Sequence, residues 1–335
     1  MSDLWMLWAV PLVAFLGYAS HRASLCTVRA VADVLEGRRF GMLGGFARAV
    51  LWAMLLTVPA SYFFPERFPL PVANGPLWTG LLGGLLFGLG AALNSGCSFS
   101  TLQRLADGDW RMLATLGGFL GGSSLGYLLP VARVEPEWAG RVTFSEAWLM
   151  LLMLALVAWA LMESFRLWRR RAEFQNLSHT QSFSPAVTAV ILGLGGGLLY
   201  LGFGPWTYTN SLQHIAGTLV GERLVPPVLQ LALIPTLLSG MLFSAWRRGS
   251  WHGRKPVRGW GANLIGGSLM GLGAAQIPGG NDTLLLRLIP SMTPHSLWTY
   301  LMLIAGVACG LLLARRFGLM PCETAGCGSG TPPSF

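Results

Sequence analysis

The sequence has 335 residues, of which 53% are hydrophobic and only 11% are charged. A soluble globular domain has roughly 25% charged residues, and a compact soluble protein of this size could not bury so much apolar surface. The net charge is +9, but there is no basic soluble module with stacking aromatic residues, so the composition excludes a nucleic-acid-binding protein and predicts an integral membrane protein.

Nine apolar segments have about the 20 residues that a transmembrane helix requires. They are residues 4–20, 41–63, 76–95, 110–131, 144–165, 185–203, 226–246, 259–276 and 295–314. The first segment lacks the basic leader of a signal peptide, because Asp3 is the only early charge, and we interpret it as a retained helix. The sequence therefore predicts an all-α integral membrane protein with about nine transmembrane helices.

Four clusters of arginine predict the orientation of the chain. They lie at Arg38-Arg39, Arg166 to Arg171, Arg247 to Arg258 and Arg315-Arg316. With nine spans and a periplasmic N-terminus, all four clusters fall on the cytoplasmic side, where basic residues collect in membrane proteins. The connections 64–75 and 132–143 then lie outside. This pattern predicts a multi-pass protein of a bacterial inner membrane with a cytoplasmic C-terminus.

Four further segments are too apolar for solvated loops and too short to cross a membrane. They are residues 23–36, 97–105, 206–220 and 281–289, and each begins at a helix-breaking or polar patch. Irregular backbone at membrane depth is tolerated only where protein or a water-filled cavity surrounds it. We therefore interpret the four segments as re-entrant half-helices.

An internal repeat relates the two halves of the chain at an offset of 183 residues. Residues 83–105 align with residues 266–288 at this offset, and twelve of the 23 positions are identical. In the same register Cys26 aligns with Thr209. Five spans, an odd number, separate equivalent points of the two copies. The second copy must therefore be inverted in the membrane relative to the first.

The repeat divides the chain into four predicted parts. They are a first repeat at 1–143, a linking helix and cytoplasmic loop at 144–184, an inverted second repeat at 185–314 and a cytoplasmic tail at 315–335. Inverted repeats with broken helices at the bilayer centre are typical of solute transporters, whose site lies between the repeats. The alternative is a membrane scaffold, or an enzyme subunit with pseudo-symmetry.

Two cysteines stand at equivalent half-helix starts in the first repeat. Cys97 follows Asn94 and Gly96 and precedes Ser98, and Cys26 has the matching place in the earlier segment. Backbone N–H groups at a helix start favour an anion, and a glycine lets another group approach the backbone closely. A single membrane cysteine is usually a small packing residue. Two at equivalent helix starts favour a role in a solute path.

The second repeat has polar residues at the corresponding places. Its half-helices open at Tyr208, Thr209 and Asn210 and at Gly279, Gly280, Asn281 and Asp282. Asp282 is either a functional carboxylate or, together with Asn281, an N-cap. Tyr208 and Asn210 are candidate ligands, although Trp206 and Tyr208 are also typical anchors at a membrane interface.

Arg104 and Arg287 are related by the repeat, and each lies seven residues past its half-helix opening. They favour an anion at the two ends of the path, or they pair with carbonyl groups at helix C-termini. We interpret Cys309 as a packing residue. Cys322 and Cys327 lie in a solvated tail and are weak evidence for a metal or redox pair.

No Walker loop, HExxH motif or GxSxG elbow occurs in the sequence. We therefore expect that this chain hydrolyses no ATP to drive transport. We also expect that it is not an enzyme and that it holds no cofactor and no metal.

The Cys26 segment, the run Ser95 to Ser98 with the following Leu102-X-Arg104-Leu105, and the inverted half-helices resemble the YeeE/YedE family of bacterial sulfur-compound transporters. The resemblance covers essentially the whole chain. It implies an hourglass-shaped permease for thiosulfate or a related small sulfur-containing anion, passed along by S–H···S contacts with Cys26 and Cys97. Family members of the thiosulfate type carry a third cysteine where this chain has Gly280, so the resemblance leaves the exact substrate open.

The expected partners are the sulfur-containing anion, the lipid bilayer and a cytoplasmic sulfur-carrier protein. Two other functions remain open. A membrane thiol oxidoreductase or sulfurtransferase would use Cys26 and Cys97 as a redox pair, which requires them within disulfide range. A small-solute channel would share the inverted half-helices, but the paired Asn-Pro-Ala openings of aquaporins are absent from the sequence.

Overall fold

The computed structural model describes residues 3–37, 39–129, 135–139, 145–169, 183–222, 228–251, 259–277 and 279–317. Several predicted features lie outside these residues. They are Arg38, the end of the Arg166–Arg171 cluster, most of the Arg247–Arg258 cluster, and the tail from residue 318 onward with Cys322 and Cys327.

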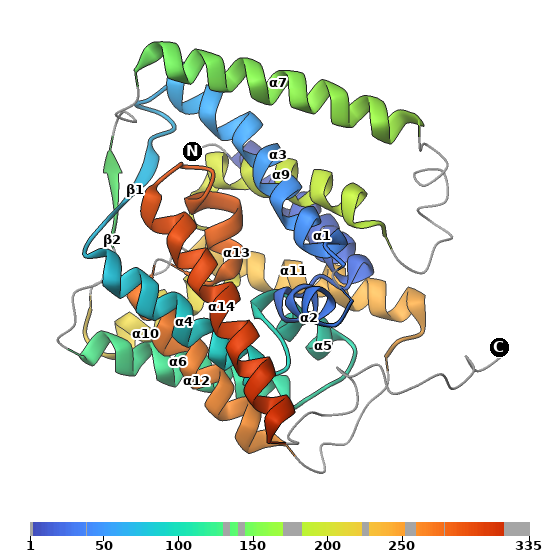
Figure 1. Cartoon of the computed structure of the whole chain (residues 1–335), viewed down its shortest axis with the longest axis vertical. Helices are drawn as coiled ribbons and strands as arrows, with labels where there is room; N and C mark the ends of the chain where they lie inside the picture. Colours follow the sequence, from blue (N-terminus) through green and yellow to red (C-terminus); the bar gives the residue numbers. More distant parts are fainter. Residues whose placement is uncertain are drawn as a thin grey trace.

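A long helix covers each of the nine segments that we predicted to span the membrane (Figure 1). The helices are α1 (Asp3–Ala23), α3 (Gly41–Phe63), α4 (Leu77–Leu93), α6 (Met112–Leu128), α7 (Glu146–Arg169), α9 (Pro185–Phe203), α11 (Val228–Arg248), α12 (Trp260–Gln276) and α14 (Pro294–Arg316). Five helical stretches of the described residues are long and apolar enough to cross a membrane. They lie at Gly41–Phe63, Leu77–Ala106, Glu146–Arg169, Pro185–Leu219 and His295–Arg316. The chain is therefore a multi-pass membrane protein, and nine crossings stay a prediction.

Short helices occupy the four segments predicted as half-helices. They are α2 (Thr27–Gly37), α5 (Ser98–Ala106), α10 (Tyr208–Leu219), and α13 (Asn281–Thr283) with its π-helical continuation η1 (Leu284–Leu288). The residues before α5, α10 and α13 are Cys97, Thr207 and Gly280, and each has an extended backbone. The predicted breaks therefore coincide with the helix starts, although entry of these helices into a membrane stays a prediction.

The one departure from a helical chain among the described residues is a pair of short strands. β1 (Leu70–Asn74) pairs antiparallel with β2 (Glu135–Ala139). Both strands contain a proline, which a two-stranded ribbon tolerates because each strand has a free edge. The pairing brings residues 70–74 and 135–139, which lie within two of the predicted connections, side by side.

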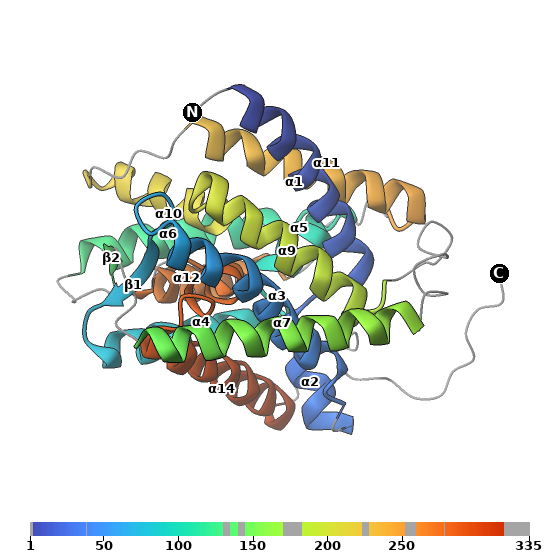
Figure 2. The same cartoon turned by 90° about the horizontal axis from the view of Figure 1, so that it is seen from above.

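The main helix contacts join a helix of the first half of the chain to a helix of the second half. α4 packs on α14 as α6 packs on α12, and α3 packs on α9 as α1 packs on α11. Figure 1 shows α4, α6, α12 and α14 as one group, and α1, α3 and α9 as a second group on the opposite side. α7 runs along the upper edge of the molecule in Figure 1, and Figure 2, seen from above, shows it in front of the other helices.

α4 and α12 also pack directly on each other, through glycines that the repeat relates. A Cβ atom added to Gly90 would lie 2.6 Å from the carbonyl oxygen of Gly266, and one added to Gly273 would lie 2.5 Å from that of Gly83. Such distances are shorter than any side chain allows, so only glycine permits this approach of the two backbones.

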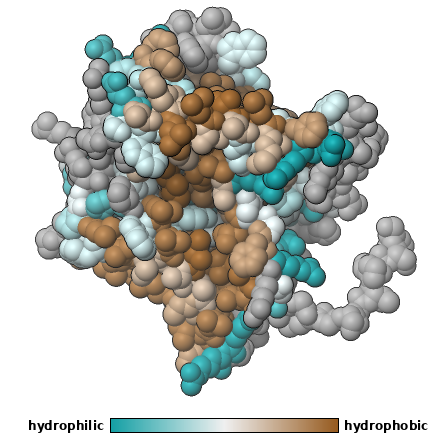
Figure 3. All heavy atoms as spheres, turned by 45° about the horizontal axis from the view of Figure 1, so that its top comes forward, coloured by the Kyte–Doolittle hydropathy of each residue, from teal (hydrophilic) through white to brown (hydrophobic). Residues whose placement is uncertain are grey.

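The outer face of α7 exposes large apolar side chains along its length, among them Trp148, Leu154 and Leu161. Figure 3 shows hydrophobic residues over much of the face viewed from this side. An apolar surface of this extent is unfavourable in water and favourable against lipid. α7 therefore has the character of a lipid-facing helix.

Candidate functional site

The starts of the four short helices meet in the interior of the protein. The Thr27 amide of α2 donates to Cys97 Sγ at 3.3 Å, and the Asn281 side chain of α13 donates to Thr27 Oγ1 at 2.8 Å. The Tyr208 hydroxyl of α10 donates to the Ser98 carbonyl of α5 at 2.6 Å. We call this meeting point the central site, which comprises residues 26–27, 97–98, 207–210 and 280–283.

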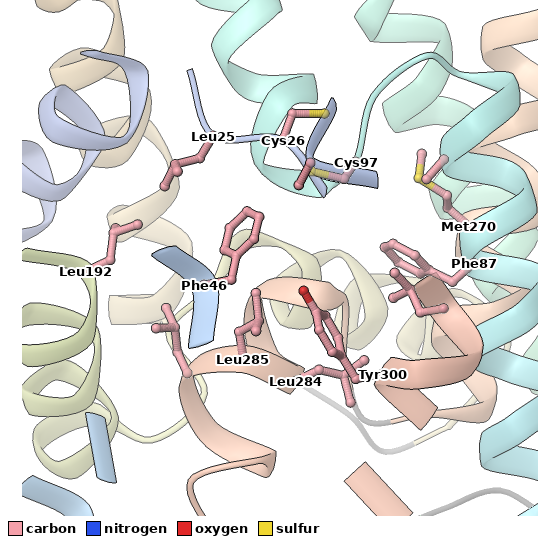
Figure 4. Close-up of a cluster of buried hydrophobic side chains, with 14 of the residues drawn as sticks. Leu25, Cys26, Phe46, Phe87, Cys97, Leu192, Met270, Leu284, Leu285 and Tyr300 are labelled. Carbon is pink, nitrogen blue, oxygen red and sulfur yellow. The ribbon is translucent and has the colours of Figure 1, made fainter. Parts of the chain in front are cut away.

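The two cysteines of the first repeat lie side by side in the central site (Figure 4). Both are free thiols, and Cys26 is 8% exposed and Cys97 is fully buried. Ser100 Oγ lies 3.4 Å from Cys26 Sγ and 3.9 Å from Cys97 Sγ. Cys309, which we predicted to pack between helices, is instead exposed on α14. The structure thus brings Cys26 and Cys97 together and separates Cys309 from them.

Several apolar and aromatic side chains face the thiols from the other side of the close-up. They are Phe46 of α3, Leu284 and Leu285 of η1, and Tyr300 of α14, all buried. Figure 4 shows the Tyr300 hydroxyl pointing toward the two sulfur atoms. These residues were not predicted, because they come from helices far apart in the chain and belong to no motif.

Asp282 is the acidic residue of the central site. The Thr209 hydroxyl donates to its two carboxylate oxygens at 2.9 and 3.0 Å, and the Ser98 hydroxyl lies 3.5 Å from Oδ1. The residue is only 2% exposed, and no described lysine, arginine or histidine lies within ion-pair distance of it. A buried carboxylate that is held by hydroxyl and backbone N–H donors, with no described cation beside it, is an uncommon arrangement.

The predicted N-cap role of Asn281 and Asp282 is wrong. The N-cap residue of α13 is Gly280, which has no side chain to cap the helix. The Asn281 side chain instead reaches two other short helices, donating to Thr27 and accepting a hydrogen bond from Ser98. Contacts between helices therefore outweigh the local capping preference of asparagine.

The predicted role of Trp206 and Tyr208 as interfacial anchors is also wrong, because both are buried, at 4% and 6% exposure. Gly204 ends α9 with a φ of +66°, a conformation that favours glycine, and the chain turns inward there. The Trp206 indole nitrogen has no hydrogen-bond partner among the described residues. Asn210 accepts from Thr283 at 2.5 Å, which joins α10 to α13.

Three of the predicted site residues shape turns. The Asn94 side chain donates to the Gly96 carbonyl at 2.9 Å and accepts from Thr115 at 2.6 Å, which fixes the turn before Cys97. A Cβ atom on Gly96 would lie 2.6 Å from Ser100 Oγ. Gly279 has a φ of +107°, where other residues are strained. These residues position the helix starts.

The two repeat-related arginines lie in different surroundings, away from the thiols. Arg104 donates to Asp109 at 2.8 Å and to the carbonyls of Asn94 and Ser95 at 3.4 Å, so it takes the predicted pairing with carbonyl groups. Arg287 is 7% exposed and lies over the ring of Tyr200, 5.7 Å from its centre.

A histidine–aspartate pair that we did not predict joins α1 to the turn after α5. The His21 ring bonds Ser244 of α11 at 2.9 Å and Asp107 at 3.1 Å. Burial raises the pKa of Asp107, but hydrogen bonds from His21 and Ser250 lower it by more, so this pKa lies below its ordinary value of 3.8. The sequence signal that could have predicted this pair was His21-Arg22, two basic residues at the end of an apolar span.

No group of three or more described His, Cys, Asp or Glu side chains could hold a metal ion. The comparison with protein-family models matches residues 22–309, which include all of the central site, to the family described as Sulphur transport. No curated protein matches the chain. The chain therefore belongs to the YeeE/YedE family of sulphur transport and is a sulfur-compound transporter.

Proposed function

We propose that this protein is a permease for thiosulfate or a closely related small sulfur anion, which crosses the membrane through the central site past Cys26 and Cys97. The observation that carries the proposal is the contact between the two buried thiols where four helix starts meet. In a sulphur transport family, thiols at this place are the natural groups to contact a sulfur atom of the solute.

The chemistry around the thiols supports this role. The Thr27 amide already donates to the sulfur of Cys97, so the site can hold a sulfur acceptor with a backbone N–H group. The Ser100 hydroxyl accepts from the Cys26 thiol and donates toward the sulfur of Cys97. An anion that leaves its hydration shell needs such donors, because burying a charge without hydrogen bonds costs many kcal/mol.

We also propose the inverted-repeat architecture, with parts 1–143, 144–184, 185–314 and 315–335. Two findings support it. In the repeat α4 corresponds to α12, and α6 corresponds to α14. When each helix is replaced by its counterpart, the observed α4–α14 pair becomes the observed α12–α6 pair. The same exchange turns the Gly90–Gly266 contact into the Gly273–Gly83 contact. The periplasmic N-terminus, the cytoplasmic C-terminus and a cytoplasmic sulfur-carrier partner stay predictions.

A thiol oxidoreductase is the second candidate, and the contact between Cys26 and Cys97 favours it. An open small-solute channel has less support. The described cavities that border the central site have volumes of about 20 and 10 Å³, room for roughly one water molecule. A freely open pore is inconsistent with a site this closely packed.

The test is uptake of radiolabelled thiosulfate by proteoliposomes that contain the purified protein. We expect saturable uptake above that of empty liposomes, competition by unlabelled thiosulfate, weaker competition by sulfate, and recovery of unchanged thiosulfate inside. Conversion of the label to another sulfur species would favour the oxidoreductase or sulfurtransferase. Non-saturable entry of unrelated solutes such as glycerol would favour a channel.

A further inference from the structure

The proposed passage of the anion past the two thiols assigns no role to Asp282, a buried carboxyl group in the same site. It stands in the second repeat, where the family resemblance leads one to expect a third thiol. A Cβ atom on Gly280 would lie 2.6 Å from Asp282 Oδ1 and 2.9 Å from Thr209 Cγ2. The carboxyl group and Thr209 therefore fill the space that a side chain at residue 280 would need. An ionisable carboxyl group therefore stands beside the backbone of residue 280.

Among the residues that the structure describes, none provides a balancing charge within ion-pair distance of Asp282. The titratable groups that face it are Tyr200 of α9, Tyr208 of α10 and Cys97 before α5, while Arg287 of η1 lies against the Tyr200 ring. Burying an unpaired carboxylate is unfavourable, and its hydroxyl and backbone N–H donors offset only a part of the cost. A sulfur anion in the same site would add repulsion between like charges, and a proton on the carboxyl group removes it.

We propose that Asp282 takes up one proton for each sulfur anion that enters the central site, so that transport is coupled to proton movement. The proton comes from water on the side of entry and binds a carboxylate oxygen; it returns to water on the side of exit. No bond of the anion is broken. This inference rests on the proposed function, since it requires an anion in the site.

A route for the proton lies next to the carboxyl group. Asp282 lines the cavity of about 20 Å³, which also touches Trp206 and, on α1, Ser20. The neighbour of Ser20 is His21, which bonds Asp107, and the Asp107 side chain is 38% exposed. A water molecule in this cavity would bring the proton to the carboxyl group from the side of α1, so the proton need not pass the two thiols.

The experiment uses full-length protein in proteoliposomes with a pH-sensitive dye inside and the membrane potential clamped at zero. For the unaltered protein we expect that an acidic exterior drives accumulation of radiolabelled thiosulfate, and that the interior acidifies in a fixed ratio of protons to anions. Counterflow exchange of thiosulfate, measured at equal pH on both sides, reports anion movement alone. If the unaltered protein moves thiosulfate without protons, the inference is wrong, whatever any variant does.

The Asp282→Asn variant separates coupling from transport. We expect it to lose accumulation driven by pH, at whatever rate it still exchanges thiosulfate in counterflow, while the matched Asp33→Asn change on α2 keeps both accumulation and exchange. The Asp282→Glu variant keeps a carboxyl group and should retain coupling. Retained coupling in this variant shows that the loss in Asp282→Asn comes from the missing carboxyl group and not from misfolding. Accumulation by Asp282→Asn at the parental proton ratio would overturn the inference and leave the proposed function standing. Absence of counterflow in the unaltered protein would refute the proposed function and the inference with it.

Discussion

The glycine crossing of α4 and α12 gives a sharp test of how the two halves fit together. In Gly90→Ala the new Cβ atom would lie 2.6 Å from the Gly266 carbonyl oxygen and 2.7 Å from the Met270 nitrogen. Both neighbours are backbone atoms, so the helices must separate by several tenths of an ångström. Overpacking of this kind costs about 1–3 kcal/mol.

The matched control is Gly117→Ala on α6, where nothing lies within 4 Å of the added Cβ atom. Both changes gain the same helix propensity, about 1 kcal/mol. The difference between the two variants therefore isolates the packing cost. Each kcal/mol shifts the melting temperature by about 2–4 °C in a domain of about 150–250 residues, and by less in a longer chain such as this one. We therefore expect Gly90→Ala to melt a few degrees below Gly117→Ala in detergent.

The repeat adds a second expectation. A Cβ atom on Gly273 would lie 2.5 Å from the Gly83 carbonyl oxygen and 2.6 Å from the Phe87 nitrogen, nearly the distances found at Gly90. Gly273→Ala should therefore lower the melting temperature by a similar amount. Equal melting temperatures for the Gly90→Ala and Gly117→Ala variants would refute the close crossing, and a harmless Gly273→Ala would refute its symmetry.

Three further predictions concern orientation and stability. A membrane-impermeant thiol reagent should label Glu66→Cys from outside intact cells but not Arg316→Cys, and the reverse pattern would invert the topology. Because the Asp107 pKa is depressed, its charge stabilises the fold above pH 3.8, and this contribution is lost as the pH falls through the depressed pKa. Asp107→Asn should thus lower the melting temperature at neutral pH but not well below pH 3.8, and a pH-independent difference would contradict the ionic role. Asn281→Ala should cost about 1–3 kcal/mol in unfolding measurements, because it leaves the buried Thr27 and Ser98 hydroxyls without their partner; unchanged stability would speak against the inter-helix role.

The long helices and the four helix starts were predictable because their signals are local. Apolar runs of membrane length mark the helices, and breakers such as Gly96 and Gly279 mark the starts. The places of Cys26 and Cys97 at helix starts predicted a role for both in one path, but their direct contact did not follow from the sequence. The neighbours Phe46 and Tyr300 were not predictable, because their contact with the thiols depends on how distant helices pack.

The wrong predictions share a physical cause. Local preferences place asparagine at helix caps and tryptophan at membrane interfaces, but both are weak compared with tertiary contacts. Asn281 bonds Thr27 across 254 residues of sequence. Trp206 is carried into the interior by the turn at Gly204. The strand pair escaped prediction because β1 and β2 are short, contain proline and pair only after the intervening helices have packed.

The central claim is that a sulfur anion passes the two thiols, and the most direct measurement is the initial rate of radiolabelled thiosulfate uptake by Cys97→Ala proteoliposomes. Losing a buried hydrogen-bonding group costs about 1–3 kcal/mol, and each 1.4 kcal/mol is tenfold, so we expect a loss of about tenfold or more. Cys26→Ala should behave similarly, and the exposed Cys309→Ala should match the parent. Uptake at the parental rate in correctly folded Cys97→Ala and Cys26→Ala proteins would contradict the claim.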